Sequence, residues 1–155
     1  AAEAGREYNS TDMGEWTLRE VYLPPFRAAV DAGTRSLMSA FNDLNGVPTS
    51  GNVFTIRRIL KGEWAFRGVV LSDWASVKEL EVHGYAEDAS DAARLGMRAG
   101  VDMDMQGNVY GKHLAELVKS GRVERTLLDD ASWAFSSAPP WTRGARRPYC
   151  WTPNT

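Results

Sequence analysis

The chain has 155 residues, which is the length of one domain, and its formal net charge of −2 argues against nucleic acid or an anionic membrane as a partner. No apolar run approaches the roughly 20 residues that a membrane span needs. A single cysteine, Cys150, permits no internal disulfide and no cysteine-based zinc site. The sequence shows no N-terminal signal pattern, so composition leaves the cellular location open.

The first part of the chain predicts two short helices. Asp12, with Glu15 three residues later, fits a helix N-cap and its reciprocal partner. Pro24 and Pro25 must break or kink this first helix, because proline has no N–H group to donate. A second short helix is then expected at residues 26–32.

Two strands are expected in the middle of the chain. Residues 35–41 alternate in polarity and predict the first strand, and the Asn-, Gly- and Pro-rich residues 42–52 predict a loop. Asn52 is suited to cap a helix at residues 53–61. The short apolar run at residues 69–71 is bounded by glycine and polar residues, which is typical of a buried strand in a parallel sheet.

The remaining chain continues to alternate between helices and strands. This order is typical of right-handed βαβ units on a parallel sheet, although three strands are too few to close a barrel. The expected elements are a short helix and loop at 75–85, a helix at 87–99 stopped by Gly100, a third strand at 101–105, and helices at 110–120 and 125–135.

The final segment differs in composition from the rest of the chain. Residues 136–155 hold four of the seven prolines, three arginines and no acidic residue. The helical period is lost after about Phe135. We therefore expect one folded unit at 1–135 and an irregular, disordered tail at 136–155 without a function of its own.

Asp73 is the main candidate for chemistry, because it directly follows the predicted strand at 69–71. Catalytic groups in α/β sheets and barrels sit at the carboxyl ends of strands. Trp74 beside it offers a flat apolar wall suited to the face of a sugar. The alternative interpretation makes Asp73 an N-cap of the next helix and Trp74 a core residue.

Other candidate sites have less support in the sequence. Asp102 and Asp104 form a D-x-D pattern that places two carboxylates on one face of a strand, where hard cations such as Mg²⁺ could bind. No third ligand is in register, so a backbone hydrogen bond is the favoured role of Asp102. The glycine-rich phosphate motifs and the G-x-S-x-G motif of serine hydrolases are absent from the sequence.

The segment RGVVLSDW at residues 67–74 resembles the nucleophile segment of glycoside hydrolase family 3. Four further segments resemble that family in its usual order: residues 9–26, 36–46, 99–105 and 113–123. The resemblance covers roughly residues 5 to 131 and implies an α/β fold of the (β/α)8 TIM-barrel type. A complete barrel takes about 250 residues, so we expect a partial barrel with about three parallel strands and flanking helices.

The resemblance also implies a function, namely retaining hydrolysis of terminal β-D-glucosyl residues through a covalent glycosyl-aspartate intermediate, without a cofactor or metal. It makes Asp73 the nucleophile and Trp74, Met38 and Phe41 the residues that contact the sugar of a small β-glucoside or oligosaccharide. Many family members carry tyrosine at the position of Phe41. In the family the acid/base is a glutamate from a separate domain, which we expect this chain to lack, and family members are often periplasmic or secreted.

The second carboxylate and the exact function stay open at this point. The acidic neighbours of Asp73 have no supporting motif; they are Glu79, Glu81, Glu87, Asp88, Asp102 and Asp104. A non-catalytic sugar-binding or structural α/β fragment is the first alternative, and β-xylosidase specificity is the second. An open piece of a barrel exposes sheet edges and apolar faces, so self-association is also expected.

Overall fold

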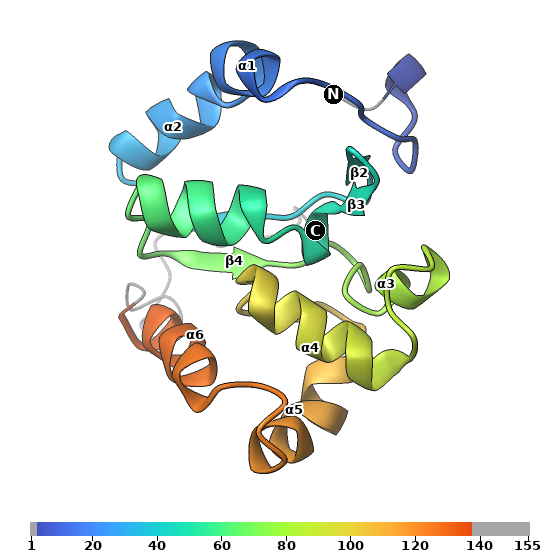
Figure 1. The fold of residues 1–155 in the computed structure, drawn as a ribbon. Helices are drawn as coiled ribbons and strands as arrows, with labels where there is room; N and C mark the ends of the chain where they lie inside the picture. The colour runs from blue at the N-terminus through green and yellow to red at the C-terminus, as the bar shows by residue number, and fades with distance from the viewer. Residues whose placement is uncertain (1–2, 138–155) are drawn as a thin grey trace, which may run out of the picture.

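The computed structural model describes residues 3–137 (Figure 1). Helices surround a short parallel β-pair, with α1 and α2 on one side of it and α4, α5 and α6 on the other. No helix in this part of the chain is long and apolar enough to cross a membrane. The elements are η1 Glu3–Gly5, α1 Glu15–Thr17, η2 Leu18–Tyr22, α2 Pro24–Asp31, β1 Ser36–Met38, β2 Asp43–Leu44, β3 Val47–Pro48, η3 Thr49–Gly51, η4 Phe54–Glu63, β4 Val69–Leu71, α3 Glu79–Val82, α4 Ala89–Ala99, α5 Val109–Lys119 and α6 Arg125–Ser137.

The parallel pair that positions the candidate site consists of β1 and β4. Ser36 is opposite Val69 and Met38 is opposite Leu71, so the carboxyl ends of both strands meet at one edge. This arrangement confirms the predicted α/β fold with parallel strands. The short antiparallel pair of β2 and β3 lies in the segment that was predicted as a loop.

The predicted third strand at 101–105 is wrong in extent. Only Met103 forms a bridge, which is parallel and joins it to Leu71. The amides of Asp102 and Met103 both donate to the carbonyl of Val70, at 2.8 and 3.2 Å, instead of alternating along a ladder. Because consecutive amides share one acceptor, the segment follows β4 without forming a regular strand.

Gly68 allows β1 and β4 to approach each other at their amino ends. A Cβ atom at this position would lie 2.2 Å from the carbonyl oxygen of Arg35, far inside van der Waals contact. The same carbonyl accepts a hydrogen bond from the amide of Val69 at 2.9 Å. Only a residue without a side chain fits between the two backbones here.

The predicted capping box at the first helix is wrong. α1 begins at Glu15 after Gly14, and no side chain caps it. Glu15 instead forms an ion pair with Arg19 one turn later, at 2.8 Å. The second helix begins at Pro24 rather than at Phe26, because the missing N–H of proline costs nothing in a first helical turn.

Several other helix boundaries agree with the sequence. Asn52 caps its helix, because its Oδ1 accepts from the amide of Thr55 at 3.1 Å. The helix that follows, η4, is a π-helix. Gly100 ends α4 in a left-handed conformation with φ of 103°. α6 extends to Ser137, two residues past the expected boundary, and the rest of the predicted tail lies outside the described residues.

The hydrophobic core joins β4 to the helices that follow it. It packs one face of η4 against α4, α5 and the turn after β4. Burial of this apolar surface is the main force that holds the strand end in place. The largest fully buried apolar side chains are Ile59, Val70, Val77, Leu80, Met97, Val101 and Val123.

Candidate active site

Asp73 lies two residues beyond the end of β4, at the edge where the parallel strands finish. Its Oδ1 accepts a hydrogen bond from the amide of Trp74 at 2.7 Å, and the residue is partly exposed. The next helix, α3, begins only at Glu79, and no side chain caps it. Trp74 is 60% exposed, so the alternative of a helix cap beside a core tryptophan is wrong.

The backbone around Asp73 is supported by the buried hydroxyl of Ser72. This Oγ accepts from the amide of Met105 at 2.8 Å and donates to the carbonyl of Asp73 at 2.7 Å. The amide of Ala75 in turn donates to the carbonyl of Met105 at 2.7 Å. Ala75 has φ of +57°, which is a strained conformation for a residue with a side chain. Such strain is found where surrounding contacts fix a functional turn.

A chain of three buried serines joins the ends of the strands below the site. The Oγ of Ser50 lies 2.7 Å from that of Ser39, at the end of β1, and 2.7 Å from that of Ser76, in the turn after Asp73. These serines were not predicted as site residues. Isolated serines carry no periodic or motif signal, and only the fold brings residues 39, 50 and 76 together.

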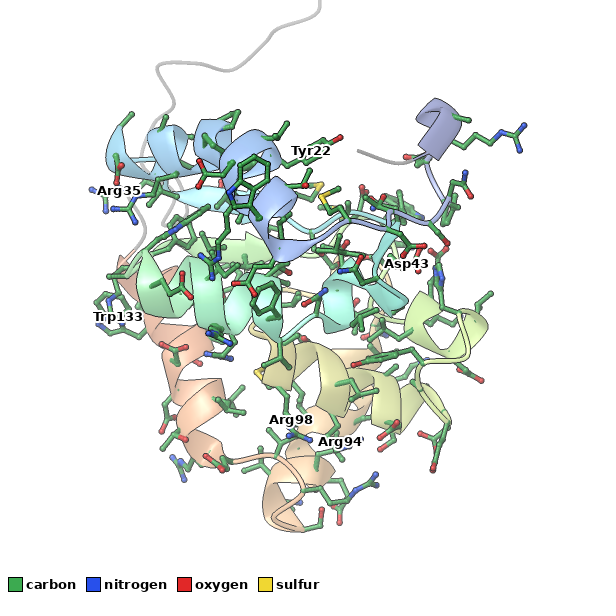
Figure 2. All side chains as sticks on the ribbon, turned by 45° about the horizontal axis from the view of Figure 1, so that its top comes forward. Tyr22, Arg35, Asp43, Arg94, Arg98 and Trp133 are labelled. Carbon is green, nitrogen blue, oxygen red and sulfur yellow. The ribbon has the colours of Figure 1, made fainter. Side chains whose placement is uncertain are left out.

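The residues expected to contact sugar do not all line the same cavity. Met38 is 52% exposed at the end of β1. Phe41 stacks against the ring of Tyr8, with 4.7 Å between centroids. An apolar cavity of about 240 Å³ between α2, η4 and β1 includes Met38 and Tyr22, the latter labelled in Figure 2. Asp73, Trp74 and Phe41 do not line this cavity. The structure therefore does not gather the four predicted residues into one enclosed pocket.

The acidic neighbours of Asp73 have different roles in the structure. Asp88 caps α4 by accepting from the amide of Asp91 at 2.7 Å. Asp104 accepts from the amide of Val109 at 2.7 Å at the start of α5. Glu81 and Glu87 are exposed. Glu79, by contrast, is a partly buried carboxylate in contact with Tyr8, and no local pattern predicted this contact.

Asp102 forms a buried ion pair with Lys61 beneath β4. Its Oδ1 lies 2.5 Å from Nζ of Lys61, and its Oδ2 accepts from the amide of Val70 at 2.8 Å. Burial raises the pKa of Asp102, and Lys61 and the Val70 amide oppose this rise. The predicted role of Asp102 as a backbone hydrogen-bond acceptor is confirmed.

The D-x-D pattern does not form a metal site in the structure. Asp102 contacts Lys61, whereas Asp104 contacts the first turn of α5, so the two carboxylates serve different partners. Within residues 3–137 no group of three or more His, Cys, Asp or Glu side chains is arranged to hold an ion.

A carboxylate just beyond a parallel strand occupies the edge where barrel enzymes carry their catalytic groups, and carboxylates are the catalytic groups of most glycosidases. Comparison with known families agrees with this class. The sequence model described as "Glycosyl hydrolase family 3 N terminal domain" matches residues 1–134. The chain belongs to glycosyl hydrolase family 3, and its fold is part of a TIM-type barrel.

The chain is similar to both glucosidases and xylosidases. It is 44% identical over 132 residues to a periplasmic β-glucosidase of Salmonella typhimurium, covering 85% of this chain and 17% of that protein. It is 48% identical over 106 residues to a β-xylosidase of Formosa agariphila, covering 67% of this chain and 14% of that protein. A β-glucosidase of Listeria innocua solved in complex with glucose superposes with a TM-score of 0.84 and 41% identity, over 86% of this chain and 19% of that one.

The chain therefore spans less than a fifth of the length of these relatives. Glycoside hydrolysis is the function that the relatives share.

Proposed function

We propose that this chain contributes the nucleophile of a retaining β-glucosidase, and that Asp73 is that nucleophile. The observation that carries the proposal is the position of Asp73 at the carboxyl edge of β1 and β4, where the hydroxyl of buried Ser72 donates to its backbone carbonyl. Its Oδ1 is held by the Trp74 amide, which orients the carboxylate. A fixed orientation favours attack, because a positioned nucleophile avoids an entropic cost during the reaction.

In the proposed reaction a carboxylate oxygen of Asp73 attacks the anomeric carbon of the sugar. The bond from that carbon to the aglycone oxygen breaks, and this oxygen takes a proton from an acid group. Water then attacks the glycosyl-aspartate ester, loses a proton and releases the sugar with its original configuration. Trp74, Met38 and Phe41 would contact the sugar from the surrounding strand ends.

Xyloside specificity is the second candidate, because the Formosa agariphila relative with 48% identity is a β-xylosidase. Glucoside specificity has support from the longer match to the Salmonella typhimurium enzyme and from the Listeria innocua structure with glucose. Xylose differs from glucose by the loss of one hydroxymethyl group. One group of this size in a binding pocket changes the ratio of kcat/KM between two substrates by only about 10–200-fold.

A mechanism-based label tests the proposal directly. The chain should be incubated with 2-deoxy-2-fluoro-β-glucosyl fluoride and, separately, with the fluoroxylosyl equivalent, and then digested for peptide mass spectrometry. We expect one fluoroglucosyl adduct on the peptide that contains Asp73, and none in an Asp73→Asn variant. An adduct on another carboxylate would reject Asp73, and faster labelling by the xylosyl reagent would favour the second candidate. Sugar binding without any adduct would indicate a non-catalytic sugar-binding role.

We also propose that the isolated chain associates with itself. Among the described residues, β1 has a strand on one side only, which leaves one edge unpaired. Trp16 is 74% exposed, and Val21 and Phe26 are also exposed on the neighbouring helices. Open strand edges and apolar surface favour association. Sedimentation velocity over a concentration series should show mass that increases with concentration, whereas one monomeric species at every concentration would contradict this expectation.

A further inference from the structure

The carboxylate of Glu79 has an environment that the proposed reaction does not explain. Glu79 is the first residue of α3, six positions after Asp73. Its Oε1 lies 3.5 Å from the hydroxyl of Tyr8, which is 71 residues away in the sequence. Its Oε2 is enclosed by protein and receives no hydrogen bond from residues 3–137. An enclosed carboxylate oxygen without a hydrogen-bond donor lowers the stability of the fold. Such a group therefore needs an explanation, and a role in the site is one.

Tyr8 connects this carboxylate to a predicted sugar-contacting residue. The Tyr8 ring stacks on Phe41 at 4.7 Å with 29° between the planes. The ring of His83 also lies against that of Tyr8, with 6.4 Å between the ring centroids and 23° between the planes. Stacked aromatic pairs at these separations are attractive beyond their buried area. The stack therefore links α3, the segment before α1 and the end of β1.

The surroundings of the Tyr8 hydroxyl favour its neutral form. Partial desolvation and then the carboxylates of Glu79, Glu7 and Asp73 raise the pKa of Tyr8 above its ordinary value of 10.0. The phenol is therefore neutral at physiological pH, and its O–H is the donor to Glu79.

We propose that Glu79 is a positioning residue, which holds the hydroxyl of Tyr8 and thereby fixes the Tyr8–Phe41 stack as a side wall of the sugar site beside Asp73. This inference rests on the proposed function, because it assumes that sugar binds at the strand ends. Glu79 acts through Tyr8 and Phe41 and has no direct part in the bond changes. Loss of the contact would leave Tyr8 free to swing away, since the residue is 53% exposed.

Phenol titration tests the contact without any sugar. The pKa of Tyr8 should be followed by the ¹³Cζ resonance in the full chain with labelled tyrosine. We expect a lower Tyr8 pKa in Glu79→Gln and Glu79→Ala, because one of the raising carboxylates is removed. Glu81→Gln is the matched control, because it removes the same charge from an exposed position on α3 and should leave the Tyr8 pKa unchanged. An unchanged Tyr8 pKa in both Glu79 variants would overturn the inference.

Sugar binding tests the consequence of the contact. Gluconolactone, which is bound in one Listeria innocua β-glucosidase structure, should be titrated into the full chain and followed by NMR. We expect Glu79→Ala and Tyr8→Phe each to weaken binding about three- to tenfold, and the double variant to be no weaker than either one. Glu79→Gln should restore most of the loss, because its amide oxygen can still accept from the phenol. Tyr8→Phe provides the same test if Glu79→Ala does not fold.

The two proposals fail in different ways in this experiment. Absence of gluconolactone binding by the parent chain would contradict the sugar site itself, and the inference would fall with it. Binding by the parent with equal affinity in Glu79→Ala and Tyr8→Phe would overturn the inference alone. An additive loss in the double variant would likewise reject a shared role for the two residues.

Discussion

Replacing Asp73 with alanine is expected to abolish turnover of nitrophenyl β-glucoside by the 155-residue chain. The side chain lost is the proposed attacking group, and its Oδ1 is the oxygen that the Trp74 amide holds in position. Loss of an enzyme nucleophile typically lowers kcat by about 10⁴–10⁶-fold. Residual turnover in Asp73→Ala should therefore fall below detection in a steady-state assay.

The choice of substrate matters, because cleavage also needs a proton donor. General acid catalysis is typically worth about 10²–10⁴-fold. If the acid group comes from outside these residues, as the family resemblance implies, the parent chain should cleave nitrophenyl β-glucoside weakly. Cellobiose should not be cleaved, because its sugar leaving group needs protonation whereas nitrophenolate does not.

Two comparisons make this result decisive. Glu87→Ala removes an exposed carboxylate and should retain the parent rate on nitrophenyl β-glucoside. Azide can replace the missing carboxylate as an attacking anion, so it should restore turnover in Asp73→Ala and produce a glucosyl azide. Equal activity in parent and Asp73→Ala would remove Asp73 from the mechanism. Brisk cleavage of cellobiose would show that a carboxylate within this chain acts as the acid.

Replacing Lys61 with methionine should destabilise the fold by about 3–5 kcal/mol. The Lys61 side chain is 10% exposed and that of its partner Asp102 is 2% exposed, so neither charge can return to water without opening the core. Methionine keeps most of the side-chain volume and removes only the charge. The carboxylate of Asp102 would then be buried with the Val70 amide as its main stabilising contact. Folded domains have only about 5–15 kcal/mol of total stability.

Urea unfolding followed by tryptophan fluorescence measures this cost. Lys112→Met is the control, because it removes a lysine from an exposed position on α5 and should change stability little. Adding Asp102→Asn to Lys61→Met should recover part of the loss, since no charge is then buried. A change below about 1 kcal/mol in Lys61→Met would contradict the buried ion pair, because it would match the value of an exposed one.

The same variant should depend on pH in a defined direction. Burial raises the pKa of Asp102, and without Lys61 this rise is less opposed. The folded state then binds a proton more tightly than the unfolded chain, so stability falls as pH rises through the raised pKa. The difference between parent and Lys61→Met should therefore shrink as pH is lowered toward about 4, where an unfolded aspartate takes up its proton.

Much of the architecture could be predicted from local sequence features. Gly100 ended a helix as expected, Asn52 capped one, and the apolar run before Asp73 became a buried parallel strand. These features depend on a few consecutive residues, whose backbone preferences and polarity are set by their own chemistry. The ordered motifs also identified the family, which the match over residues 1–134 confirms.

The tertiary structure decided which long-range partners each polar side chain has. Asp102 and Asp104 share a local pattern, yet one pairs with Lys61 and the other caps α5. Glu15 fits a capping box but pairs with Arg19. Local spacing allows several hydrogen-bond partners of similar energy, and packing of the whole chain selects among them.

The difference between local patterns and long-range packing also explains which features of the site the sequence determined. The sequence determined that Asp73 and Trp74 follow a buried strand, since both lie directly after the run that forms β4. The contacts of Ser72, the serines at 39, 50 and 76, and the pairing of Tyr8 with Glu79 join segments up to 71 residues apart. Such contacts form only when the strands and helices pack, because burial of the core brings the segments together and no local preference encodes their meeting.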